Sequence, residues 1–116
     1  MIAGGQPAEA LRVISALPGG DQYRLAYEAI ASVRLGDRAA SDRALAQLVR
    51  RYSVEAQYQI ADVHAQRDEA DEAFAAIDRA WNLADPGLLE LKTDPMFTPL
   101  RADARFAGWV RKIGFF

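Results

Sequence analysis

Apolar residues recur along this chain at spacings of three and four, which is the spacing of one face of an α-helix. Breaks in the pattern fall at glycine and proline clusters: Gly4-Gly5, Pro18-Gly19-Gly20, Gly36 and Pro86-Gly87. The pattern predicts helices after Pro7, at about 22–35, after Gly36, at about 54–67 and after Asp68. No stretch of four to eight residues alternates apolar and polar positions, as a half-buried strand would. The sequence therefore predicts an all-α fold.

Three turn-and-helix segments of the chain resemble one another. They cover residues 5–17, 36–48 and 68–80, and their starts lie 31 and 32 positions apart. A small residue occupies the same offset in each segment: Ala10, Ser41 and Ala73. A further predicted helix precedes each of the last two segments, and Ala29 and Ala61 match within those helices. The repeating unit is therefore helix, short turn, helix, with small residues where two helices cross closely.

This unit resembles the tetratricopeptide repeat (TPR). The resemblance rests on Ala29…Gly36-Asp37…Ser41…Leu45…Leu48, on Ala61…Asp68-Glu69…Ala73…Ile77…Ala80-Trp81, and on the half unit Gly5-Gln6…Ala10…Ile14…Leu17. Asp68 stands where the family usually has a turn glycine. The resemblance implies an α-α superhelix, a right-handed solenoid of antiparallel helix pairs that binds proteins without catalysing a reaction.

The C-terminal tail resembles a capping segment that often closes the C-terminal TPR arrays of bacterial regulatory and signalling proteins. The residues that carry this resemblance are Asp94, Pro95, Phe97, Pro99, Leu100, Arg101, Asp103, Arg105, Phe106 and Gly114. Three prolines predict short helical turns here, at positions 86, 95 and 99. Asp103 is expected to cap a last helix that covers the end of the array with Phe106, Trp109, Val110 and Ile113. Trp81 is expected to pack the last repeat against this tail.

These observations predict a single domain over residues 1–116. It comprises a half repeat at 5–20, repeats at 21–53 and 54–85, and a cap at 86–116. The formal net charge is −2 with scattered basic residues, which argues against nucleic-acid binding by this segment. Cysteine is absent, which excludes disulfides and thiolate chemistry. No apolar run approaches the ~20 residues that span a bilayer, so we expect no membrane insertion and a cytoplasmic location.

The single histidine invites a search for a catalytic or metal site. Asp68 follows His64 by four positions, so the two are expected to share a helix face. A zinc site needs further histidine or cysteine ligands, which the sequence lacks. We interpret His64 as a packed helix residue, with a metal or acid–base role as the alternative. The nearby acids at 68, 69, 71 and 72 are interpreted as helix-start residues. No catalytic, cofactor-binding or metal-binding residue is predicted, and the chain is not expected to be an enzyme.

First helices line the concave side of such a solenoid, so their inward positions are the candidate binding surface. These concave-face residues are Tyr23, Tyr27, Ile30, Arg34, Tyr58, Asp62 and Gln66. We expect them to bind a peptide, a helix or a neighbouring domain of a protein partner. A competing interpretation has some of the tyrosines packing between units. The alternative function is self-association as a homodimer through the apolar face of residues 10–17, which lack a preceding helix.

Overall fold

The computed structural model describes residues 21–114, and within that range every regular element is helical. The α-helices are α2 (Asp21–Arg34), α3 (Arg38–Tyr52), α4 (Gln57–Gln66), α5 (Ala70–Asn82) and α6 (Ala104–Ile113). Two short 3₁₀ helices, η1 (Pro86–Glu90) and η2 (Pro95–Leu100), lie between α5 and α6. The prediction of an all-α fold is confirmed for this range. The half repeat predicted at 5–20, with its apolar face, lies outside the described residues.

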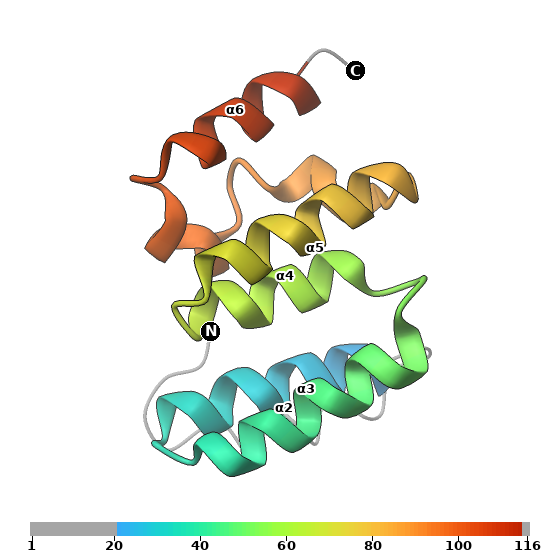
Figure 1. The fold of residues 1–116 in the computed structure, drawn as a ribbon, viewed down its shortest axis with the longest axis vertical. Coiled ribbons are helices and arrows are strands. Elements are labelled where there is room, and N and C mark those ends of the chain that lie inside the picture. The colour runs from blue at the N-terminus through green and yellow to red at the C-terminus, as the bar shows by residue number, and fades with distance from the viewer. Residues whose placement is uncertain (1–20, 115–116) are drawn as a thin grey trace.

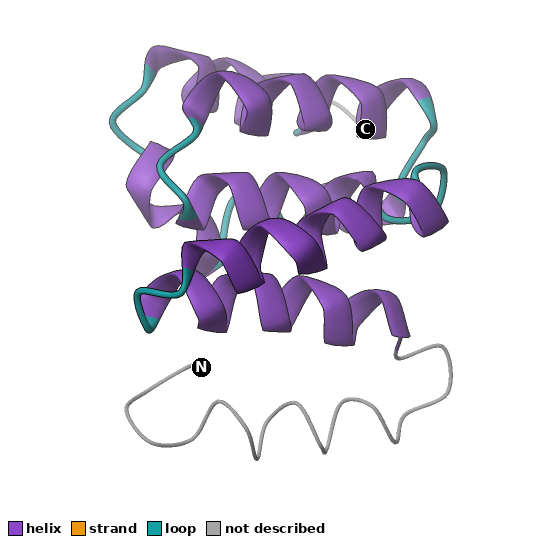
Figure 2. Ribbon diagram, turned by 60° about the horizontal axis from the view of Figure 1, so that its bottom comes forward, coloured by secondary structure: helices purple, strands orange, loops and turns teal. Residues whose placement is uncertain are grey.

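The helices form two stacked antiparallel pairs followed by the tail (Figure 1). Helix α2 packs against α3, α4 packs against α5, and the two pairs meet mainly where α2 runs beside α4. The short helix η2 packs against α4, and α6 lies at the far end of the molecule. Short loops join all these elements (Figure 2). None of the helices in residues 21–114 combines the length and the apolar character that crossing a membrane requires.

The small residues that match between the repeated segments lie in the core. Ala29, Ser41, Ala61 and Ala73 are all fully buried. A larger side chain at these positions would force the helix axes apart, because protein interiors leave few voids for it to occupy. We therefore expect these four positions to tolerate only small side chains.

The turn within each helix pair has the same backbone geometry. Gly36 has φ of 84° and Asp68 has φ of 60°, so both adopt the left-handed conformation. The next amide in each turn donates back across the helix end, from Asp37 to the Ser32 carbonyl at 2.8 Å and from Glu69 to the His64 carbonyl at 2.9 Å. This is the Schellman arrangement that satisfies orphan carbonyls at a helix C-terminus. Asp68 thus adopts the backbone conformation that glycine adopts in the first turn.

The tail contains three helical segments, η1, η2 and α6, and an aspartate caps the N-terminus of each. Asp85, Asp94 and Asp103 accept hydrogen bonds from the amides two positions later, those of Gly87, Met96 and Arg105. Such side-chain caps satisfy amides that a short helix leaves without partners. The predicted short turns and the Asp103 cap are therefore confirmed.

The last helix covers the second pair as expected. Phe106 is buried, and Trp109 stacks at a tilt on Trp81 with ring centroids 5.8 Å apart. Lys112 places its ammonium over both indole rings, 4.6 Å and 4.9 Å from the centroids. The predicted packing of Trp81 against the tail is confirmed.

Candidate functional site

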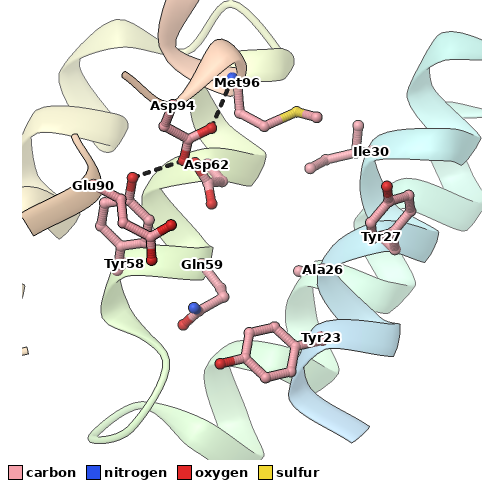
Figure 3. Close-up of a pocket in the computed structure, with 10 residues that line it drawn as sticks. All are labelled: Tyr23, Ala26, Tyr27, Ile30, Tyr58, Gln59, Asp62, Glu90, Asp94 and Met96. Carbon is pink, nitrogen blue, oxygen red and sulfur yellow. Dashed lines mark hydrogen bonds between the residues drawn. The ribbon is translucent and has the colours of Figure 1, made fainter. Parts of the chain in front are cut away.

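A cavity of about 200 Å³ opens between α2 and α4, beneath the tail (Figure 3). We call it the inter-helix pocket. Its lining residues are Tyr23, Ala26, Tyr27 and Ile30 of α2, Tyr58, Gln59 and Asp62 of α4, Glu90 of η1, Asp94, and Met96 of η2. The α2 residues recur at spacings of three and four, so they share the face that looks toward α4. Two helices of different pairs and the tail therefore build this one pocket.

Tyr58 anchors the tail to α4 at the pocket wall. Its hydroxyl donates to Asp94 Oδ2 at 2.6 Å, and its amide donates to Asp85 Oδ2 at 3.2 Å. Its ring packs on Phe97 with centroids 5.6 Å apart. Burial, followed by the hydrogen bond to Asp94, raises the pKa of the Tyr58 phenol far above its usual value. Tyr58 is therefore a neutral hydrogen-bond donor in a structural position.

Asp62 lies beside Asp94 at the base of the pocket (Figure 3). Burial raises the pKa of Asp62 to about 10, with further contributions from a hydrogen bond with Asp94 and from the negative charges of Asp94 and Glu90. At neutral pH Asp62 therefore holds a proton and can donate it in a hydrogen bond to the Asp94 carboxylate. The negative charge of Asp94 favours the neutral form of Asp62, because two adjacent carboxylates repel each other.

Two side-chain oxygens of the pocket lack donors. Oδ1 of Asp62 and Oε1 of Gln59 are buried, and no hydrogen-bond donor of the described residues reaches either. Buried oxygens in folded proteins almost always accept a hydrogen bond, and leaving one without a donor costs about 1–3 kcal/mol. Both residues project from α4 into the same pocket. The pocket thus presents unused acceptor capacity.

Five of the seven predicted concave-face residues line this pocket: Tyr23, Tyr27, Ile30, Tyr58 and Asp62. The remaining two contact each other, because Arg34 Nε donates to Gln66 Oε1 at 3.0 Å. Gln66 also donates to the Met96 carbonyl at 2.8 Å. The structure therefore brings all seven to one side of α2 and α4, with Arg34 and Gln66 beyond the pocket.

The competing interpretation, that tyrosines pack between units, applies to some of these residues and not to others. Tyr58 and Ile30 are each only 4% exposed, so they belong to the core as well as to the pocket wall. Tyr23, in contrast, is 47% exposed. A test of binding should therefore leave Tyr58 unchanged, since its loss would disturb the fold.

Sequence reasoning missed four polar or flexible residues of the pocket: Gln59, Glu90, Asp94 and Met96. Asp94 precedes a proline and locally indicates only a helix cap, which it also is. Gln59 follows Tyr58 directly, and no periodic signal separates it from an ordinary surface glutamine. The position of the tail over α4 brings Glu90, Asp94 and Met96 to the pocket, and the local sequence does not encode that position.

The expectation for His64 was wrong about its partner. His64 Nδ1 lies 2.9 Å from Glu69 Oε1, and Asp68 does not take part. Helix α4 ends at Gln66, so Asp68 stands in the turn and the i, i+4 relation of a continuous helix does not apply. Glu69 also accepts from Arg67 and Arg38, at 2.9 Å and 2.7 Å.

Arg67 joins the two helix pairs at this turn. Its side chain is only 6% exposed and donates to Ser41 Oγ at 2.7 Å and to Asp42 at 2.6 Å. The acids interpreted as helix-start residues are thus partly ion-pair partners: Glu69 pairs with Arg67, and Asp71 pairs with Arg105 at 2.9 Å. Across residues 21–114 no group of three or more potential ligands is arranged to hold a metal ion.

Comparison of the chain with protein-family models, with curated proteins and with solved structures finds no match.

Proposed function

We propose that this chain is a non-catalytic protein-interaction module, a TPR-like solenoid that binds a partner protein at the inter-helix pocket. The observation that carries the proposal is the pocket itself, which two first helices of successive pairs build together. A concave surface between repeated helices is where solenoid proteins bind extended partners.

The internal repetition of the described residues supports the TPR-like interpretation. Arg34 and Gln66 occupy equivalent positions of α2 and α4, 32 residues apart, and they hydrogen-bond to each other. The turns at Gly36 and Asp68 share one backbone geometry. Helices that stack with equivalent residues side by side are what a repeat array requires.

The size and chemistry of the pocket favour binding over catalysis. Small-molecule sites usually measure about 300–1,000 Å³, and this pocket is about 200 Å³. Among its ten lining residues none is serine, cysteine, histidine or lysine, so the Ser–His and Cys–His pairs of covalent catalysis are not found there. One partner side chain fits the pocket better than a cofactor does. A contact of this size suits micromolar affinity, about −8 kcal/mol.

Panning a peptide display library against the full chain tests the proposal. Peptides that are selected should bind with a Kd of about 1 μM in a fluorescence anisotropy assay. Glu90→Arg should weaken them by about tenfold or more, because it reverses a charge at the pocket edge. Glu72 is an exposed acid on α5, away from the pocket, so Glu72→Arg is the matched control and should leave the affinity unchanged.

Circular dichroism should show the same helicity for both variants, since both positions are exposed. A library that yields no specific peptide would overturn the proposal. So would peptides that bind wild type and Glu90→Arg equally well.

A further inference from the structure

We propose that the inter-helix pocket receives the guanidinium group of an arginine side chain from the partner protein. The inference rests on the proposed function and names the chemistry that the pocket recognises. It stands on four features of the described residues: the charge of the pocket, its unused hydrogen-bond acceptors, its aromatic and flexible walls, and the spread of its polar groups.

The acidic lining of the pocket favours a positively charged ligand. Asp62, Glu90 and Asp94 contribute three carboxyl groups, of which that of Asp62 is uncharged at neutral pH, and none of the ten lining residues is basic. Arg24 of α2 does not line the pocket and bonds with Asp21 and Glu28 on its own helix. Negative potential in a concave, partly desolvated site attracts a positively charged group and disfavours an anionic one.

The side-chain oxygens without donors favour a ligand that carries several N–H groups. Gln59 Oε1 and Asp62 Oδ1 are buried without donors, and both residues line the pocket. The Glu90 carboxylate stands at the edge and is exposed. A guanidinium group carries five N–H donors in one plane, so a single group can satisfy acceptors on α4 and on η1 together.

The walls suit the remainder of an arginine side chain. Tyr23 and Tyr27 stand on α2 opposite the acidic side, and Figure 3 shows both rings at the pocket. Guanidinium planes stack well on aromatic faces. Ile30, Ala26 and Met96 supply apolar surface for the methylene stem, and the Met96 side chain extends from η2 toward α2.

The same features favour arginine over lysine and over a metal ion. An ammonium group is compact and strongly hydrated, so it cannot reach Gln59, Asp62 and Glu90 at once. Metal ions need closely converging ligands, and no such group occurs within the described residues. Arginine therefore matches the spread of the polar groups in this pocket.

An NMR titration of the full, isotope-labelled chain tests the inference with three small probes. The probes are the N-acetyl amides of arginine, lysine and citrulline. Citrulline is the matched neutral probe, because it keeps the shape of arginine and replaces the guanidinium by urea. The arginine probe should bind in the millimolar range and shift amide signals of α2, α4 and η1. It should bind about tenfold more tightly than the citrulline probe and more tightly than the lysine probe.

Variants of the lining residues test whether the arginine probe binds at the inter-helix pocket. Glu90→Gln should weaken the arginine probe by about threefold to tenfold at neutral pH. Asp62→Asn should weaken it by a similar factor at pH 9, where binding favours the charged form of Asp62. Asp78→Asn removes one exposed carboxylate from α5 and is the control that should change nothing. Glu90 is exposed, so Glu90→Gln remains informative even where the substitution at the part-buried Asp62 disturbs the fold.

The inference is overturned by equal binding of the arginine and citrulline probes, by equal or tighter binding of the lysine probe, or by signal shifts that map away from the pocket. Its failure and that of the proposed function are distinguishable. Peptides from the display library that bind at the pocket without arginine would leave the function standing and overturn the inference. If the arginine probe binds but the library yields no peptide, the pocket does recognise a guanidinium group, and the proposal that a partner protein binds there is overturned.

Discussion

The Tyr58 hydroxyl donates a 2.6 Å hydrogen bond to the Asp94 carboxylate across 36 positions of sequence. Through this contact α4 and the tail hold each other in place at the wall of the inter-helix pocket. The same carboxylate accepts from the Met96 amide at 2.9 Å, which starts η2. Pocket geometry and tail geometry are therefore coupled through one side chain.

Tyr58→Phe should destabilise the protein by about 1–3 kcal/mol, since it leaves a part-buried acceptor of Asp94 without its donor. The ring would keep its packing on Phe97, so the loss isolates the hydroxyl. Urea denaturation followed by circular dichroism measures the free energy of unfolding. Tyr23→Phe is the control, because the exposed Tyr23 ring should tolerate the change within about 0.5 kcal/mol. Equal stabilities of the two variants would contradict the prediction.

Gly87→Ala should destabilise the protein because the tail passes very close to Tyr58. A Cβ atom at Gly87 would lie 2.8 Å from two carbons of the Tyr58 ring, so the backbone or the ring must move. We expect a loss of about 1–3 kcal/mol by thermal or urea unfolding. Gly108→Ala in α6 is the matched control, since a Cβ there meets nothing within 4 Å. That control should be neutral or gain up to about 1 kcal/mol from helix propensity.

The stability of the protein should depend on pH through Asp62. The folded-state pKa of Asp62 is about 10, whereas an unfolded aspartate titrates near 3.9. Between these values the unfolded chain releases a proton that the folded chain retains, so rising pH favours unfolding. This contribution is fully present below about pH 4 and declines as pH rises toward 10, by up to about 1.4 kcal/mol per pH unit.

Comparison with Asp62→Asn isolates this effect from the other acids. The difference in unfolding free energy between wild type and Asp62→Asn should move in favour of the variant from pH 5 to pH 9. Urea midpoints across that range measure it, with Asp78→Asn as a variant that should run parallel to wild type. A difference that stays constant with pH would show that Asp62 ionises normally.

Arg67→Ala should cost about 2–5 kcal/mol, because it removes a nearly buried charge that bonds Ser41, Asp42 and Glu69 together. Arg38→Ala is the matched control. Arg38 also pairs with Glu69, but its side chain is 56% exposed, so we expect a loss of about 0–1 kcal/mol. Calorimetry of the two variants measures the contrast, and similar losses would mean that burial of Arg67 contributes little.

Binding of the arginine probe should release protons. A guanidinium beside Asp62 favours its charged form, so its pKa falls when the probe binds. Tyr58, Glu90 and Asp94 face Asp62 from its own side of the pocket, and Tyr23 and Tyr27 face it from α2. The Kd should therefore decrease from pH 6 to pH 9, as NMR titration can measure, and Asp62→Asn should remove the pH dependence. A Kd that is constant over this range in the wild type would contradict the coupling.

The helix pairs could be predicted because their signals are local. The small residues Ala29 and Ala61, and the stripes around them, depend only on helical spacing. Five of the ten lining residues of the pocket were predicted for the same reason, because they recur on one face of α2 or of α4. The tail residues of the pocket were not, because Asp94 reaches the pocket only when the chain folds back over α4. The partner of His64 was missed because α4 ends at Gln66, before the expected contact could form.

Asp94 both caps η2 and lines the pocket, so it cannot be substituted without disturbing the tail, whereas other lining residues can. A genetic screen for loss of binding should recover Asp94 substitutions readily, yet those variants would fail through misfolding of the cap as well as through altered recognition. Gln59 and Glu90 carry no cap, so the preference of the pocket can be rewritten at these two positions while the tail still folds. An engineer who wishes to redirect this surface toward another side chain should therefore vary Gln59 and Glu90 and keep Asp94 fixed.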